Sequence, residues 1–444
     1  LSGRKLGKVF QFFLSFGNAT DANGAASVST TVFTNGVGGV WMGLQTLFLT
    51  PFYWFSAVWF RRCRLITMGD LFVDRFRSTS LGGLYALVNL FFAILLIGVG
   101  YLATYKILAP MMVKPESVYT AQERQVVDDF EEYQALNAQY TAGALPEANR
   151  ARFDELQDLV KRDEARPYIS YVDELTLYIF YAVIIAIYVM AGGLQAAAVT
   201  DALQGILIIV FSVMLIPLGF SEVGGFSGLH AKVPEYMFLL FGSVKMSEFT
   251  WYSILAITLG SLIQIFGLQH NMAIGGSATT EFAGRLGEVT GTFAKRFMIL
   301  CWMICGLIAY ALFSGDLADP DNTWGMLCFT LLGPGLLGLM IAGMLAANMS
   351  TIEGSAIAVS GLFVRNLYEP LRSGRPQGHY VQVGRLVILV VMVFGVMLAL
   401  MSEGIIPMFT TVITFGTMWG AAVVMIFFWR RLTSQAVFIS VVIW

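Results

Sequence analysis

Long apolar runs separated by short polar stretches dominate this chain. Ten runs are complete, and each is close to or above the roughly 20 residues that a helix needs to cross a bilayer. Backbone groups in hydrocarbon must form hydrogen bonds inside their own segment, so the runs predict helices. The pattern is typical of an all-α polytopic membrane protein. The runs cover residues 6–34, 38–60, 81–108, 172–193, 197–219, 251–276, 294–314, 335–363, 384–402 and 405–429.

The runs divide the chain into four parts. Residues 1–113 hold the first three membrane helices, residues 114–171 form a polar insert, and residues 172–434 hold the other seven helices. An eleventh run, 435–444, is too short to cross a bilayer, so we expect the start of a truncated further helix. Because the chain also begins with Leu1, we expect it to be a fragment.

Composition and charge support a membrane protein. Of 444 residues, 57% are hydrophobic and 13% are charged, against about 25% charged in an ordinary soluble domain. So few charges cannot cover a water-facing surface, and we expect the lipid bilayer to be a partner. The net charge of −2 offers no basic excess to nucleic acid. The cysteines and histidines form no metal-ligand pattern, and no catalytic triad spacing or phosphate-binding loop indicates an enzyme.

Lysine and arginine positions predict the orientation. If the runs alternate across the membrane, every basic cluster between them falls on one side, which the positive-inside rule makes the cytoplasm. We therefore expect a multi-pass protein of the inner or plasma cell membrane. The clusters are Arg4, Lys5 and Lys8; Arg61, Arg62 and Arg64; Arg285, Lys295 and Arg296; Arg365, Arg372, Arg375 and Arg385; and Arg430 and Arg431.

The polar insert has its own pattern. Acidic residues outnumber basic residues by 14 to 7 between positions 114 and 174. Helical periodicity over about 120–142 and 146–165, with a Gly- and Pro-containing turn between them, predicts a helical hairpin. By alternation of the membrane helices, this hairpin lies on the outer side. It either extends a loop or docks a partner protein.

The first apolar run contains a polar cluster. Between Gly17 and Gly24 it holds two asparagines, a threonine and Asp21. Such groups are costly at mid-membrane unless they face protein or a water-filled cavity. A helix broken at this point would offer free carbonyl and N–H groups to a cation and a polar solute. The alternative is that the cluster only packs against small residues of a neighbouring helix.

A second irregular run follows five runs later. In residues 251–276, the polar residues Gln269, His270 and Asn271 precede two glycines. This spacing predicts two five-helix repeats of inverted topology, each with a broken first helix.

The eighth run supplies hydroxyl groups. Gly343, Ala347, Ser350, Thr351 and Gly354 fall on one face of the predicted helix. The two hydroxyls, the Ala347 carbonyl and two carbonyls of the broken first helix would give five oxygen ligands, which suits a hard cation such as sodium. Close packing against another helix is the alternative role of such a stripe.

Four motifs in this order resemble the sodium:solute symporter family. They are the basic lead-in at 3–7, the segment 67–76, the Gly-Gly-Leu to Thr-Asp to Gln stretch at 192–204, and the helix 346–351 that ends in two hydroxyl residues. The resemblance implies a leucine-transporter-type fold of two inverted five-helix repeats with broken first helices. It also implies symport of an organic solute by alternating access, with Na⁺ as the coupling ion and without a cofactor.

The resemblance further implies roles for single residues. Two hydroxyls and three carbonyls would bind sodium, and one acidic residue would lie near the cytoplasmic sodium exit. The sodium ligands are Gly17, Thr20, Ala347, Ser350 and Thr351, and the exit residue is Asp201.

Position and polarity alone predict the residues around the solute. They suit a small polar organic solute, such as a sugar, an amino acid or a carboxylate. Galactose is disfavoured, because Ile265 stands where the galactose symporters have a gating tyrosine. The alternatives are a proton-coupled carrier of the same fold, and a channel or sodium sensor that does not pump. The predicted solute-lining residues are Asp21, Asn23, Gln264, Gln269 and His270.

Overall fold

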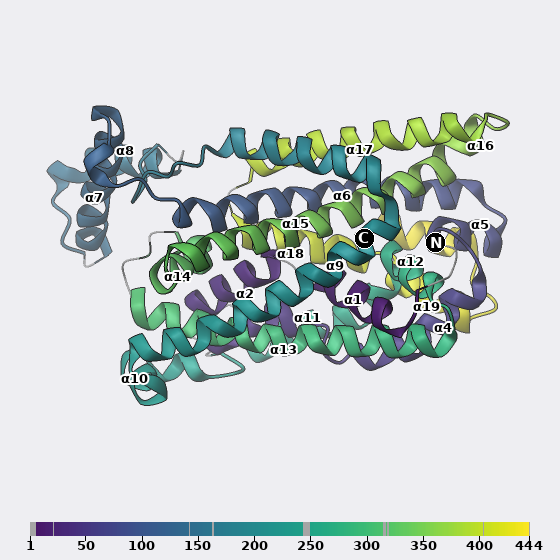
Figure 1. The fold of residues 1–444 in the computed structure, drawn as a ribbon, viewed down its shortest axis with the longest axis horizontal. Helices are drawn as coiled ribbons and strands as arrows, with labels where there is room; N and C mark the ends of the chain where they lie inside the picture. The colour runs from purple at the N-terminus through teal and green to yellow at the C-terminus, as the bar shows by residue number, and fades with distance from the viewer. Residues whose placement is uncertain are drawn as a thin grey trace.

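The computed structural model describes residues 6–20, 22–141, 143–161, 164–242, 249–313, 317, 319–402 and 404–443. At 18–19, 161, 188, 191–203, 265, 273 and 413 it describes the backbone alone. Every regular element in these residues is a helix, which confirms the all-α prediction. The longer helices lie along the long axis of the molecule (Figure 1).

The helices differ greatly in length, because polar and glycine-rich segments interrupt several apolar runs. They are α1 (Lys8–Ala19), α2 (Ala22–Asn35), α3 (Trp41–Leu44), α4 (Tyr53–Cys63), α5 (Met68–Phe76), α6 (Thr79–Leu108), α7 (Ala121–Thr141), α8 (Arg150–Lys161), α9 (Glu174–Val223), α10 (Gly225–Lys232), α11 (Trp251–Gln264), α12 (Gln269–Ser277), α13 (Glu281–Phe313), α14 (Thr323–Leu331), α15 (Pro334–Phe363), α16 (Glu369–Leu371), α17 (Gln377–Leu400), α18 (Ile405–Thr417), α19 (Gly420–Phe428) and α20 (Ser434–Ile443).

Six stretches of the described chain are long and apolar enough to cross a membrane, and the bent pair α11–α12 makes a seventh. The first two predicted runs are not among them, because each is divided into shorter helices. The six stretches are Thr79–Met111, Gln204–Val223, Glu281–Phe313, Pro334–Leu371, Gln377–Leu400 and Ile405–Phe428.

The two runs predicted over 172–193 and 197–219 form one continuous helix, α9, of 50 residues. The ribbon of α9 runs along the bundle and then turns back, so its two parts lie along the bundle in opposite directions, as two separate runs would (Figure 1). The two parts of α9 also have different neighbours. The Met190 carbonyl accepts a hydrogen bond from Arg385 of α17 at 3.4 Å, whereas Gly205 lies against Phe16 of α1.

Helix α1 packs directly on α13. An added Cβ at Gly287 of α13 would lie 2.3 Å from the Gln11 Cβ, and one at Gly291 would lie 2.5 Å from the Phe12 carbonyl oxygen. Two glycines one turn apart therefore allow the two backbones to approach closely, as small residues do in membrane helix pairs. The long helix α13 holds the short helix α1 in place.

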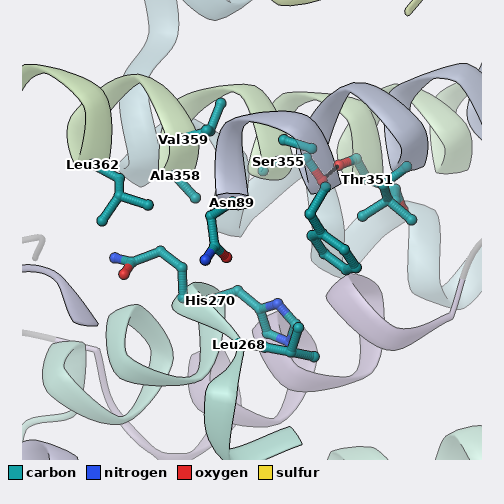
Figure 2. A pocket seen from close by; sticks show the side chains of 13 residues that line it. Asn89, Leu268, His270, Thr351, Ser355, Ala358, Val359 and Leu362 are labelled. Atoms are coloured by element: carbon teal, nitrogen blue, oxygen red, sulfur yellow. Dashed lines mark hydrogen bonds between the residues drawn. The ribbon is translucent and has the colours of Figure 1, made fainter. Parts of the chain in front are cut away.

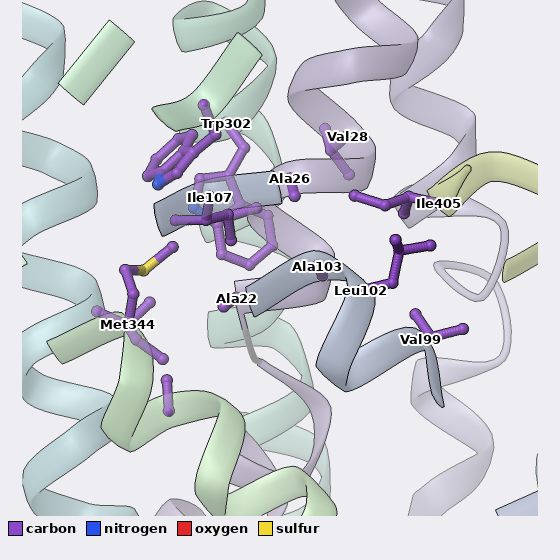
Figure 3. Packing of buried hydrophobic residues seen from close by; sticks show 14 of the residues in the cluster. Ala22, Ala26, Val28, Val99, Leu102, Ala103, Ile107, Trp302, Met344 and Ile405 are labelled. Carbon is purple, nitrogen blue, oxygen red and sulfur yellow. The ribbon is translucent and has the colours of Figure 1, made fainter. Parts of the chain in front are cut away.

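Apolar side chains fill the space around α2. Figure 3 shows Ala22 and Ala26 of α2 among residues of three other helices, with Ala103 of α6, Trp302 of α13 and Met344 of α15. All five belong to one buried cluster. The polar cluster of the first run is therefore surrounded by protein rather than by lipid.

The insert forms the predicted helical hairpin, from α7 and α8, which projects from one end of the bundle (Figure 1). The Tyr133 and Phe153 rings stack with centroids 5.8 Å apart, and Leu156 is fully buried beside them. At its base, the Lys114 N–H donates to the Ile169 carbonyl at 2.8 Å, which brings the two ends of the insert together. The hairpin is thus a self-contained unit on a narrow base.

Candidate functional site

The first apolar run is broken where the sequence predicted. Helix α1 ends at Ala19 and α2 begins at Ala22. Between them, Thr20 has an extended backbone, with φ −127° and ψ 102°, and its N–H donates to the Gly17 carbonyl at 3.2 Å. Gly17, Thr20 and Asn23 are buried, whereas Asp21 lies outside the described residues. The break therefore presents backbone carbonyls and polar side chains inside the bundle.

The sixth run is also broken as predicted. Helices α11 and α12 meet at an angle of 43°, with a 3₁₀ turn over Ile265–Gly267 and an extended Leu268 between them. Gln264 is buried and His270 is half-buried. The Gln269 side-chain oxygen accepts the Met68 N–H at 2.7 Å, so part of this amide holds the start of α5.

Hydrogen bonds join the two broken spans at one end. The Leu6 N–H donates to the Ser277 carbonyl at 3.2 Å, and the Thr279 N–H donates to the Leu6 carbonyl at 2.9 Å. Farther inside, the Gln11 amide donates to the Ser277 hydroxyl at 2.9 Å. The first helices of the two predicted repeats are therefore direct neighbours.

The hydroxyl stripe of α15 is buried, and α15 contacts both α1 and α2. Ala347, Ser350 and Thr351 are 2%, 7% and 6% exposed. The Gly343 end of the stripe faces the Phe211 ring of α9, so the packing role applies there. Thr351, eight residues further on, instead faces internal cavities.

Two threonine hydroxyls in this region are buried and have no hydrogen-bond partner among the described residues. They are Thr20 Oγ1 at the break of the first run and Thr351 Oγ1 on α15. A buried hydroxyl left unsatisfied costs about 1–3 kcal/mol, so such atoms are uncommon unless a ligand completes them. Oxygen donors of this kind, together with helix-end carbonyls, fit a hard cation such as sodium.

A central cavity of about 200 Å³ lies between the two breaks. Its walls come from α2, α3, α4, α6, α11, α12, α13, α15 and α18, so both broken spans contribute. The polar lining residues are Ser27, Gln45, Thr46, Tyr53, Gln264, His270, Thr292, Lys295, Arg296 and Thr351. A cavity with this mixture of apolar and convergent polar groups has the character of a small-molecule site.

A smaller cavity of about 70 Å³ continues along α15. Figure 2 shows Asn89 of α6, His270 of α12, and Thr351 and Ser355 of α15 around it. His270 and Thr351 line both cavities. These two residues therefore stand between the central cavity and the space beyond it.

The positions of Lys295 and Arg296 correct a sequence prediction. The sequence grouped them with Arg285 in a cytoplasmic basic cluster at the start of the run 294–314, but α13 begins at Glu281 and carries both at mid-helix, where they line the central cavity. Two adjacent basic residues interrupt an apolar pattern without interrupting a helix. Counting apolar residues therefore could not place Lys295 and Arg296 inside α13. Helical spacing from Thr292 would have put Lys295 and Arg296 within one turn.

Arg296 also explains why the second run is irregular. Its guanidinium donates to the Gly43 carbonyl at 3.2 Å, to the Thr46 carbonyl at 3.4 Å and hydroxyl, and to the Thr50 hydroxyl at 3.4 Å. The 3₁₀ turn over Thr50–Phe52, which contains Pro51, interrupts the helix in this run. The buried cation satisfies carbonyls that the interruption leaves without helical partners.

At the opposite end from the Leu6 contacts, three spans converge on the loop before α14. The Thr30 hydroxyl donates to the Pro320 carbonyl at 3.0 Å, and the Asp321 carboxylate accepts the Ile405 N–H at 2.8 Å. Lys106 of α6 pairs with Asp319 at 2.7 Å. Burial, with nearby Asp319, raises the pKa of Asp321 to about 6.

The role of Asp201, like the roles of the other predicted site residues, stays a prediction. Asp201 lies in α9, at a position where the backbone alone is described. Its assignment to the sodium exit therefore still rests on the sequence motif.

A bundle whose first and sixth membrane segments break beside a shared polar cavity has the leucine-transporter type of fold. A solved structure of a Na⁺-coupled sialic acid symporter, substrate-bound and outward-open, matches 98% of this chain and 80% of its own, with a TM-score of 0.67 and 16% identity. MhsT in complex with L-phenylalanine matches 98% of each chain, with a TM-score of 0.55 and 14% identity. At these identities the similarity shows the fold.

The family follows from the sequence match. The model of the sodium:solute symporter family matches residues 172–443, more than half of the chain, and the chain belongs to this family. This confirms the family that the motifs indicated.

Relatives with similar sequences include sodium cotransporters and a sodium symporter. Sodium/glucose cotransporter 4 of Mus musculus is 26% identical over 255 residues, 48% of this chain and 36% of the relative. Sodium/myo-inositol cotransporter 2 of Bos taurus is 25% identical over 251 residues, 48% and 37%. The sodium/pantothenate symporter of Haemophilus influenzae is 25% identical over 203 residues, 45% and 41%. The matched part of the chain thus spans about two fifths of these relatives' length.

Proposed function

We propose that this protein is a sodium-coupled secondary active transporter that imports a small polar organic solute across the cell membrane by alternating access. The observation that carries the proposal is the break of the first span against α15, where Thr351 Oγ1 is buried without a hydrogen-bond partner among the described residues. Membership of the sodium:solute symporter family supports it. The proposed sodium ligands are the hydroxyls of Ser350 and Thr351 and the carbonyls of Gly17, Thr20 and Ala347.

The ligand geometry fits weak, releasable sodium binding. The Gly17 carbonyl already accepts one hydrogen bond, from the Thr20 N–H, and a carbonyl oxygen has a second lone pair for a cation. All five proposed ligands are neutral oxygens. A site without a full negative charge attracts sodium moderately, so the ion can be released on the cytoplasmic side, where Asp201 is the proposed exit residue.

The solute would occupy the central cavity. Gly24 and Ser27 of α2 line it, and α2 begins at the break that holds the proposed sodium ligands. Sodium and solute would thus order the same broken span, and each would raise the other's affinity by one shared coupling free energy. Gln264 and His270 line the cavity, and Asn23 and Gln269 lie on the elements around it.

Alternating access requires two groups of helices that move relative to each other. The two broken spans, with α3–α4 and α13, form one connected group, since α1 contacts α12 and α13. Helices α6, α9, α15 and α17 form the other. The sodium site lies between the groups, so binding there would favour one relative position over the other.

The test is uptake by the purified full chain in proteoliposomes, with sodium or choline outside. With an inward-directed sodium gradient, we expect the solute to reach a higher concentration inside the vesicles than outside. With choline in place of sodium, the internal concentration should at most equal the external concentration. Accumulation that follows a proton gradient and ignores sodium would identify a proton-coupled carrier. Sodium-dependent binding without accumulation would identify a sensor or channel, and either result would overturn the proposal.

The main contacts of α7 and α8 in the described chain are within the hairpin, so we do not assign it a part in this cycle. We place it on the outer side of the membrane, from the alternation of the spans. Its compact, salt-bridged surface, with Arg152 paired to Asp129 at 2.7 Å and to Glu132 at 2.8 Å, is also available to a partner protein.

A further inference from the structure

We infer that the solute is a small organic carboxylate, recognised in the central cavity by Arg296 and Lys295 of α13. The inference rests on the proposed function and adds the charge class of the solute. It comes from the charges around the cavity. Both basic residues line it, and no aspartate or glutamate of the described chain does.

Arg296 is a buried cation without a buried counter-ion. Its side chain is 6% exposed, and its described hydrogen bonds all go to neutral carbonyl and hydroxyl oxygens. In the described chain, no carboxylate lies within ion-pair distance of it. Neutral oxygens fix the guanidinium but do not cancel its charge, and a charge inside a membrane protein is costly unless something pairs with it.

Glu288, two turns away on the same helix, does not neutralise Arg296. A Cβ at Gly275 would lie 3.0 Å from Glu288 Oε1, so this carboxyl faces α12 rather than the cavity. Neither of its side-chain oxygens has a hydrogen-bond partner among the described residues, so no guanidinium donates to it.

The guanidinium still has a donor to offer. It carries five N–H groups, and the described bonds use Nε, one Nη1 hydrogen and Nη2. One Nη1 hydrogen therefore remains for a ligand beside the ammonium group of Lys295, one residue along α13. A carboxylate, which accepts up to four hydrogen bonds, can bind both groups at once.

The rest of the cavity wall suits the body of a small organic acid. Met42, Ile299, Phe409 and Val412 contribute apolar surface to it. The indole N–H of Trp302 is already used, donating to the Ser212 hydroxyl at 3.0 Å. A small body that is apolar in part and ends in one anionic group fits these walls, which also carry neutral polar side chains such as Gln45 and Thr292.

The experiment compares matched ligands on the purified full chain in 150 mM NaCl and in 150 mM choline chloride. The ligands are butyrate, pyruvate and benzoate, with butyramide, benzamide and galactose as neutral counterparts and chloride against sulfate as inorganic anions. We expect the carboxylates to raise the thermal unfolding midpoint in sodium and the neutral compounds to leave it unchanged. Equal or better binding of an amide or galactose, or no binding of any carboxylate, would overturn the inference.

Variants separate recognition from folding. Arg296→Gln should weaken carboxylate binding more than tenfold, and because Arg296 also holds the irregular second run, Lys295→Gln provides a second test with the same expected direction. Arg285→Gln removes the same charge from the same helix outside the cavity, and should leave carboxylate affinity within about twofold. Undiminished carboxylate binding in both cavity variants would contradict the inference.

The outcomes also separate this inference from the proposed function. Sodium-driven accumulation of a neutral solute would leave the transporter proposal standing and defeat the carboxylate. Carboxylate binding that is lost in Lys295→Gln, without sodium-driven accumulation of the carboxylate, would support the carboxylate inference and defeat the transporter proposal.

Discussion

Replacing Thr351 by valine should stabilise the protein without sodium and weaken it as a sodium binder. Thr351 is 6% exposed on α15, and its Oγ1 has no hydrogen-bond partner in the described chain. Valine keeps the shape of the side chain and removes the hydroxyl. Without sodium, the buried hydroxyl destabilises the protein because it has lost its hydrogen bonds to water. If this hydroxyl binds sodium, the substitution should raise the stability in choline and lower the affinity for sodium.

The sizes follow from the same atom. Removing a buried, unsatisfied hydroxyl should raise the free energy of unfolding in choline by about 1–3 kcal/mol. In sodium at about 100 times its Kd, binding stabilises the native protein by about 2.7 kcal/mol. A tenfold loss of affinity, worth about 1.4 kcal/mol, would halve that sodium stabilisation in Thr351→Val.

The assay is thermal unfolding of the purified variants over a sodium titration, with choline keeping the ionic strength constant. Thr258→Val is the matched control. Thr258 on α11 is also buried, at 7% exposed, and its Oγ1 has no hydrogen-bond partner in the described chain, yet it lies outside the proposed site. It should gain stability in choline and keep the full sodium shift. An unchanged sodium titration in Thr351→Val would refute the assignment of its hydroxyl to sodium.

Three further changes test other parts of the structure. Gly291→Val should press a side chain onto the Phe12 carbonyl and cost about 1–3 kcal/mol in thermal unfolding, whereas Gly361→Val, with nothing within 4 Å, should be tolerated. Replacing residues 116–168 by a short Gly-Ser turn should leave sodium-driven uptake intact, because Lys114 and Tyr171 pair the ends of the insert; lost uptake in a folded variant would show that the hairpin is needed. Burial raises the pKa of Asp321 to about 6 in the native state, against about 4 in the unfolded chain. The native state therefore binds more protons between these two values, and the free energy of unfolding should fall as the pH rises from about 4 to about 6. In Asp321→Asn, the thermal unfolding midpoint should change little over this pH range. A fall as large as that of the unsubstituted protein would contradict the role given to Asp321.

The two helix breaks could be predicted because their signals are local. Polar residues and glycines inside an apolar run are costly in a continuous membrane helix, so the cluster around Thr20 and the residues after Leu268 marked the breaks. The hairpin could be predicted for the same reason, since the apolar residues that join α7 and α8 recur at helical spacing. In each case the residues that decide the local structure are close together in the sequence.

The cavity could not be predicted in this way, because its polar groups find their partners far along the chain. Arg296 bonds to Gly43, Thr46 and Thr50, about 250 positions earlier. From the sequence, the second run looked like a plain apolar helix and Arg296 like a loop residue. Both interpretations were wrong. The backbone of the second run is irregular, and its free oxygens accept hydrogen bonds from the buried guanidinium of Arg296 in α13.

The placement of Thr351 also bears on how ion and solute are coupled. This residue lines the central cavity and the smaller cavity beyond it, and it offers one of the proposed sodium ligands. A ligand that contacts the wall at Thr351 would therefore adjoin the ion directly, without a chain of intermediate residues. Coupling is reciprocal, so a carboxylate in the cavity should raise sodium affinity by the factor by which sodium raises carboxylate affinity. For an anionic solute, direct attraction to the neighbouring sodium ion adds to that factor, and in a low-dielectric cavity this attraction is stronger than in water.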